Sequence, residues 1–116
     1  MEVIADGLYH ADIWLPEQLN KPILFQKERY IWSHHAREKP LVDKIAPWLQ
    51  LKLYPVEVQI DAQLPIKTLY RGPYDQIHDL CVVVRTQTPP FVVTLWLIKY
   101  WDKHQTLVRE RYIKRP

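Results

Sequence analysis

Cysteine, glycine and long apolar runs are scarce in this sequence, and each shortage excludes a class of protein. The single cysteine, Cys81, cannot form a disulfide within the chain, so nothing calls for an oxidising compartment. Two glycines against ten prolines leave few sites for turns with positive φ, and the prolines argue against a helical bundle. No apolar run approaches the roughly 20 residues of a membrane span, and residues 1–20 lack the lysine or arginine of a secretory signal. We therefore expect a soluble cytoplasmic protein, or a soluble domain of a larger one, that does not associate with membranes.

The length and composition are those of one globular domain. The chain has 116 residues, of which 47% are hydrophobic and 25% charged, so it is long enough for one compact core. Its net charge of +3 is unevenly distributed: residues 1–20 carry four acidic and no basic side chains, whereas residues 99–116 carry six basic and two acidic ones. A basic C-terminal segment with an interleaved aromatic residue suits the phosphate backbone of a nucleic acid, although a solvated terminus explains the same charge.

The region after residue 30 is expected to be helical. Ser33 is a favourable N-cap for a helix that begins at His34. Pro40 and Pro47 interrupt this region, which favours two short helices over a single straight one. Apolar side chains recur at helical spacing, so one face should pack inward; they are Leu41, Ile45, Trp48 and Leu49.

Strand patterns begin after Pro55. Segments with alternating or β-branched residues are separated by short turns, so neighbouring strands should pair antiparallel. Cys81 lies in the run LCVVV and is expected to be a buried, dispensable core residue. The fold class is therefore predicted as α+β, with an N-terminal helical segment packed on a four- to five-stranded antiparallel β-sheet. The predicted strands are residues 56–60, 66–72, 77–86, 91–101 and 106–113.

We divide the predicted single domain, residues 1–116, into three parts. Residues 1–29 are an N-terminal extension, in which residues 5–16 fit a hairpin or an irregular arm and residues 15–22 allow at most a short helix. Residues 30–98 form the core. Residues 99–116 form a basic C-terminal strand or tail.

The side chains that could carry chemistry are basic, aromatic or hydroxylic, and they lack the spacing of metal ligands. His34 and His35 are adjacent and so diverge on a helix, and Cys81 is the only thiol, so we expect no metal and no cofactor. Cleavage of RNA through its own 2′-hydroxyl needs a base, an acid and cations around the phosphorane, but neither a metal nor a protein nucleophile. Suitable side chains occur at the predicted helix start, where backbone N–H groups also attract phosphate, and on three successive strands: His34, His35, Arg37, Lys39, Tyr70, Arg71, His78, Arg85 and Thr94.

These segments resemble a known nuclease family. The motif SHHAREK at residues 33–39, followed by LYRGPYDQIHDLCVVVRT and PFVVTLWL, resembles the small ribonucleases grouped around barnase, EndoU, the tRNA-cleaving colicins and RelE. Compact members carry Ser-x-His-Ala-x-x-Arg on the first helix and a late hydrophobic strand that ends in Val-x-Thr. The resemblance covers residues 30–98.

The resemblance implies a helical part packed on a four-stranded antiparallel sheet. It also implies a metal-independent, toxin-type endoribonuclease that leaves 2′,3′-cyclic phosphate ends. Carried over by position, the helix histidine is His35, the strand arginine is Arg71 and the late threonine is Thr94. The implied partners are RNA and an antitoxin or immunity protein.

Our leading hypothesis from the sequence is an RNA-cleaving domain. The alternative is a non-catalytic RNA-binding or protein-interaction domain that uses the same basic and aromatic face. In a nuclease, His35, Arg71 and Thr94 should face one cleft, whereas in a binding module they can be scattered. The predicted catalytic residues are His35, Arg71, Thr94, Tyr70 and His78, and the predicted RNA- or phosphate-binding residues are His34, Arg37, Lys39, Arg85, Arg109 and Arg111.

Overall fold

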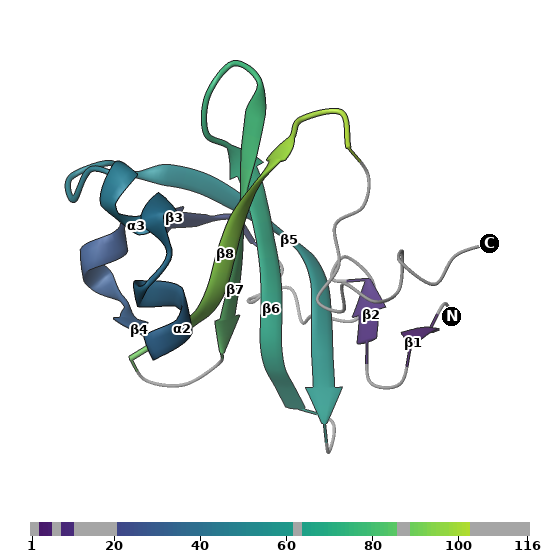
Figure 1. Cartoon of the computed structure of the whole chain (residues 1–116). Coiled ribbons are helices and arrows are strands. Elements are labelled where there is room, and N and C mark those ends of the chain that lie inside the picture. Colours follow the sequence, from purple (N-terminus) through teal and green to yellow (C-terminus); the bar gives the residue numbers. More distant parts are fainter. Residues whose placement is uncertain (1–2, 6–7, 11–20, 62–63, 86–88, 103–116) are drawn as a thin grey trace.

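The computed structural model of the chain describes residues 3–5, 8–10, 21–61, 64–85 and 89–102, and β-strands dominate it (Figure 1). Its centre is a meander of four long strands, whose sequences alternate or run through the β-branched residues that fit a pleated, partly buried sheet. The prediction of consecutive antiparallel strands across residues 55–98 is confirmed. The four strands are β5 (Leu51–Asp61), β6 (Leu64–Pro73), β7 (His78–Arg85) and β8 (Phe91–Lys99).

Within the described ranges, four short strands extend and close this meander. β1 (Val3–Ala5) pairs with β2 (Leu8–His10), and β2 pairs with one half of β5. β3 (Ile23–Phe25) pairs with the other half of β5, and β4 (Ile31–Trp32) pairs in parallel with the start of β8. The segment that holds β3, the 3-10 helix η1 (Lys27–Arg29) and β4 therefore joins the two ends of the meander, and the sheet curls.

Two short helices lie beside β8: α2 (His34–Arg37) and α3 (Pro40–Lys44) (Figure 1). Ser33 caps α2 as predicted, because the Ala36 N–H donates to its Oγ at 2.9 Å. Pro40 occupies the first turn of α3, where its missing N–H has no helical partner to lose. The prediction of two short helices is thus confirmed, but Trp48, predicted to pack inward with them, lies after α3 and is 78% exposed. No helix among the described residues is long and apolar enough to cross a membrane.

The predicted α+β fold class is wrong. The described residues form a curled, mixed sheet of eight strands, and two helices of four and five residues do not make a helical layer on it. Lys39, the residue before Pro40, is extended with ψ 132°, which ends α2, and Ile31 and Trp32 pair with β8 instead of entering a helix. The predicted strand over residues 106–113 and most of the predicted short helix at 15–22 lie outside the described residues.

Alternate residues of the sheet face two separate hydrophobic clusters. Leu80 and Val82 of β7 face the first cluster, which the curled sheet surrounds together with β3 and α2, and Cys81 faces the second cluster on the other side. Cys81 is fully buried, as predicted, and burial raises the pKa of its thiol to about 12. The first cluster consists of Phe25, Ala36, Ile45, Leu51, Leu53, Leu80, Val82, Val84, Val92 and Leu95, and the second of Leu69, Cys81 and Val83.

β6 approaches β5 closely at Gly72. A Cβ added there would collide with the backbone oxygen of Lys52 and would lie 2.9 Å from Leu53 Cδ2. Glycine therefore allows the two strands to come together next to the side chain of Arg71.

Candidate functional site

The predicted catalytic residues lie on both faces of the sheet. The helix α2, which carries His35, packs into the first cluster. Arg71 pairs with Cys81 and Thr94 pairs with Val83, and residues directly opposite in a sheet share a face, which here is the face of the second cluster. The structure therefore does not bring His35 together with Arg71 and Thr94 in one cleft.

The basic residues of α2 are exposed to solvent. His34 Nε2 lies 2.8 Å from Glu38 Oε1, and both of these side chains are largely accessible. His35 and Arg37 are also exposed. This helix can meet a ligand, but only on its own side of the sheet.

The remaining predicted residues are spread over the molecule. Tyr70 packs against the first cluster, and burial raises the pKa of its phenol. The Lys39 ammonium donates to a carbonyl of β8 at 3.0 Å. β7 begins at His78 and ends at Arg85, which is exposed. The Arg85 guanidinium lies 5.9 Å from the centroid of the Phe91 ring. Arg109 and Arg111 lie outside the described residues.

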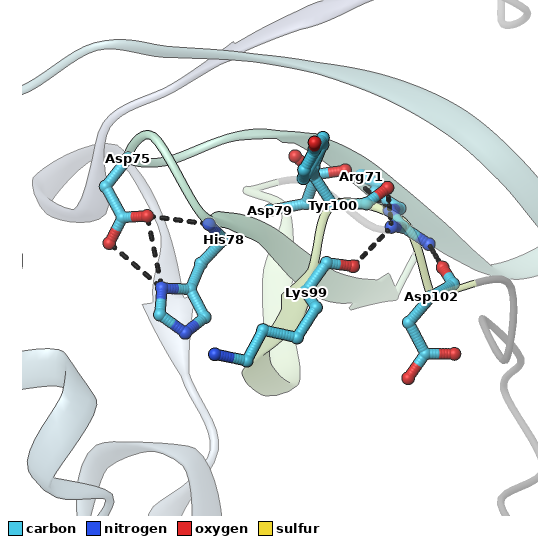
Figure 2. A network of polar contacts seen from close by, with 7 residues as sticks. All are labelled: Arg71, Asp75, His78, Asp79, Lys99, Tyr100 and Asp102. Atoms are coloured by element: carbon cyan, nitrogen blue, oxygen red, sulfur yellow. Dashed lines mark hydrogen bonds and ion pairs between the residues drawn. The ribbon is translucent and has the colours of Figure 1, made fainter.

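Arg71 is at the centre of a polar network at the end of the meander (Figure 2). Its Nε donates to Asp79 Oδ2 at 2.8 Å. Its terminal nitrogens donate to the main-chain carbonyls of Asp102, Lys99 and Tyr100 at 2.8, 3.1 and 3.2 Å. The Arg71 side chain is only 9% exposed. These bonds attach the turn that follows β8 to β6, so Arg71 organises the backbone at this position.

The loop between β6 and β7 lies beside this turn and is closed by Asp75 (Figure 2). One carboxylate oxygen of Asp75 accepts from the N–H of Ile77 at 2.8 Å and from that of His78 at 2.6 Å, and both oxygens lie 3.1 Å from His78 Nδ1. The backbone N–H of Ile77 and then that of His78 lower the pKa of the Asp75 carboxyl. The Ile77 carbonyl accepts from the Tyr100 N–H at 2.9 Å, which links the loop to the turn.

The turn held by Arg71 presents two large aromatic side chains to solvent, and we call residues Lys99–Asp102 the aromatic turn. Tyr100 and Trp101 are 60% and 61% exposed, and their ring centroids lie 4.9 Å apart in an edge-to-face arrangement. The Lys99 ammonium lies 5.8 Å from the centroid of the Trp101 ring. An exposed aromatic pair beside a cation can stack a flat ring and neutralise an anion attached to that ring.

Sequence analysis did not identify Tyr100 and Trp101 as site residues. They follow FVVTLWLIK without a break, so the pattern predicts the last residues of a buried strand. The sequence predicts a turn at the polar run DKHQ directly after them, and the position of the pair next to this turn is the signal that could have identified them. His78 and Arg71 are the predicted residues that the structure does place next to the aromatic turn.

Within the part of the chain that the structure describes, no three histidine, cysteine, aspartate or glutamate side chains are grouped so that they could hold a metal ion. Comparison with known proteins finds no matching family model, no matching curated protein and no matching solved structure. The function is therefore inferred from the geometry of this chain.

Proposed function

We propose that this chain is a non-catalytic RNA-binding domain that stacks bases of single-stranded RNA on the aromatic turn. The observation that carries the proposal is the exposure of Tyr100 and Trp101, at 60% and 61%, on a turn that Arg71 holds. Stacking of bases on aromatic side chains is a common and sequence-tolerant way to bind single strands. Because hydrogen bonds already fix the turn, little conformational entropy is lost when a base stacks on it.

Cations near exposed aromatic rings support the proposal. Lys99 lies beside Trp101, and on β5 the Lys52 ammonium lies 5.6 Å from the ring centroid of Tyr54, which is 47% exposed. Tyr54 is opposite Arg71 in the β5–β6 register, so this second aromatic–lysine pair lies on the face of the sheet that carries Arg71. A single strand that stacks on both pairs would have a lysine beside each base for its phosphates.

Two aspartates near the turn, Asp75 and Asp79, are engaged within the protein, which limits their repulsion of RNA phosphates. Asp79 is ion-paired with Arg71, and its side chain is 19% exposed. Asp75 accepts hydrogen bonds from its own loop. Their negative charges are therefore partly compensated before any ligand arrives.

RNA cleavage stays a prediction from the sequence. His35 lies on the other face of the sheet from Arg71 and Thr94, and Arg71 already donates to Asp79 and to three carbonyls. An antitoxin or immunity protein is expected as a partner only if the chain cleaves RNA. The cytoplasmic location belongs to the same proposal, because the proposed ligand is intracellular RNA.

The RNA-binding proposal is tested by fluorescence anisotropy with a labelled oligouridylate of about 12 nucleotides. We expect Trp101→Ala to weaken binding about tenfold, since stacking contributes about 1–3 kcal/mol per base and about 1.4 kcal/mol corresponds to tenfold. Trp48→Ala is the matched control, because Trp48 is 78% exposed but lies in the loop before β5. We expect this control to bind as the wild type does. Equal losses in the two variants, or no binding by the wild type, would contradict the proposal.

A second assay separates binding from cleavage. When the wild-type protein is incubated with total RNA and EDTA, we expect the RNA to stay intact, whereas products with 2′,3′-cyclic phosphate ends would establish a ribonuclease. In that case His35→Ala should lower cleavage by about 10²–10⁴ with little change in thermal stability. His34→Ala should have a much smaller effect, because adjacent residues of a helix are rotated by about 100°.

A further inference from the structure

A second surface lies along one edge of β8 and meets the aromatic turn at Lys99. On its other side, β8 pairs with β7 from end to end. On this side, β4 pairs only with Phe91 and Val92. In the described part of the chain, no strand pairs with this edge over residues 93–99. Unpaired strand edges are templates for another extended chain.

Side chains from the helical segment cap the first acceptors of this edge. Ser33 Oγ donates to the Val93 carbonyl at 2.7 Å, and Lys39 Nζ donates to the Leu95 carbonyl at 3.0 Å. Residues two apart in a strand direct their backbone groups to the same side, so Leu97 presents its N–H and C=O to the edge that Leu95 shares. At the other end of the strand, the Lys99 carbonyl accepts from the Asp102 N–H at 2.9 Å and from Arg71 at 3.1 Å. The edge is therefore capped at both ends, and Leu97 lies between the caps.

A pocket of about 330 Å³ opens beside this edge, between α3 and β8. Its volume is at the lower end of the roughly 300–1,000 Å³ of small-molecule sites, and it suits one or two side chains of a partner. Apolar side chains make most of the wall, with two lysines among them. The lining residues are Lys39, Pro40, Leu41, Lys44, Leu95, Trp96 and Leu97.

The charges around the pocket select among the occupants that could pair with this edge. Lys39 and Lys44 line the pocket, and Lys99 ends the strand. The neighbouring acidic residues Glu38 and Asp43 do not line the pocket. A second copy of the chain, paired edge to edge about a twofold axis, would bring like lysines together. An acidic strand from another protein is complementary.

We propose that the edge of β8 binds an extended, acidic peptide segment of a partner protein by strand addition at Leu97, between the capped carbonyls of Leu95 and Lys99. A bulky apolar side chain of the peptide enters the pocket, and flanking carboxylates meet Lys39 and Lys44. Main-chain hydrogen bonds supply affinity in this mode, and the pocket and the charges supply selectivity. The proposal does not rest on RNA binding at the aromatic turn, although Lys99 borders both surfaces.

The test uses capped, fluorescent heptapeptides Glu-Glu-Val-X-Val-Glu-Glu in which X is Leu, Ile, Met, Phe, Tyr or Trp. We expect at least one member to bind, and its affinity to fall about tenfold when lysines replace the glutamates. Replacing both valines by proline should abolish binding, because proline cannot donate to a strand. No binding by any member at millimolar concentration, or equal affinity of the acidic and basic peptides, would overturn the proposal.

Variants of the protein locate the bound peptide. Lys44→Glu should weaken binding about tenfold, and Lys21→Glu, at an exposed lysine before β3, should leave it unchanged. The amide hydrogen of Leu97 should exchange more slowly in the complex. Unchanged exchange at Leu97, or equal losses in the two variants, would overturn strand addition.

Displacement of the peptide by oligouridylate would assign the edge to RNA instead. Trp101→Ala should keep full peptide affinity while it loses RNA affinity. The peptide and RNA assays can therefore contradict the two proposals independently.

Discussion

The guanidinium of Arg71 donates to the Asp79 carboxylate and to three main-chain carbonyls of the aromatic turn. Hydrogen bonds that involve a charged group contribute about 1.5–3 kcal/mol, more than neutral ones. A cation enclosed in this way affects a ligand through the backbone that it holds. At the scale of the single residue, Arg71 is therefore a positioning residue for Tyr100 and Trp101.

We expect Asp79→Asn to weaken RNA binding. The loss of the carboxylate removes the ion pair that orients Arg71, so the aromatic turn loosens and the free energy of unfolding should fall by about 1.5–3 kcal/mol. If Arg71 contacted an RNA phosphate directly, the same change would release a cation and strengthen binding. Anisotropy titration together with urea denaturation separates the two cases, and tighter binding by Asp79→Asn would refute the positioning role.

Residue types in the candidate site were predictable from the sequence, but the faces on which they lie were not. Arg71 and His78 stood out as basic residues on adjacent predicted strands, and both border the aromatic turn. Thr94 shares the face of Arg71, whereas His35 does not, because a shift of one residue in a strand reverses the face and a helix can pack on either side. Cys81 was recognisable as a core residue from the run LCVVV, and its dispensability stays a prediction.

At the scale of the element, the loop between β6 and β7 should respond to acid. The N–H groups of Ile77 and His78 hold the pKa of Asp75 below its ordinary value of 3.8. A carboxyl whose pKa is lower in the folded state stabilises the fold above pH 3.8 and loses this effect as the pH falls through the folded value. We expect Asp75→Ala to destabilise the protein at neutral pH and to approach the wild type in strong acid. Urea denaturation of both proteins from about pH 6 to about pH 2 measures this convergence. Parallel profiles would show that the bonds to Asp75 are not maintained.

The close approach of β6 to β5 gives a second prediction at this scale. Gly72→Ala places a methyl group against the backbone oxygen of Lys52, and overpacking costs about 1–3 kcal/mol. RNA affinity should fall with stability, because the neighbouring Arg71 would be displaced. Pro73→Ala, at the adjacent exposed position, is the control and should have a much smaller effect. Thermal unfolding of both variants tests the prediction, and a Gly72→Ala protein of wild-type stability would contradict the close approach.

The long strands could be predicted and the short ones could not, for a physical reason. β5 to β8 each have eight or more residues, enough to show alternation or a β-branched run. β3 and β4 have three and two residues, too few for a period, and their pairing depends on distant partners. The sequence around Trp32 also leads directly into the capped helix α2, so its local signals are those of a helix start.

At the scale of the whole molecule, these short strands change the fold class. Phe25 of β3 lies in the part of the chain predicted as an N-terminal extension, yet it is fully buried in the first cluster. The centroid of its ring lies 5.0 Å from the ring centroid of Tyr30 and 6.1 Å from that of Trp32. The aromatic residues of the joining segment thus pack against the sheet where a helical segment was predicted to pack.

The joining segment also has a consequence for the order in which the molecule assembles. β4 meets β8 sixty residues further along the chain, as the bond from Ser33 to Val93 shows, whereas β5 to β8 follow one another through short connections. Closing a long loop costs more chain entropy than closing a short one, and non-local pairing forms slowly. The four-strand meander should therefore be the folding nucleus, and closure by β3 and β4 should come after the main barrier. In reverse, release of this segment would be the first step of unfolding, and the rate at which it opens would set how long the apolar interior stays sealed from water.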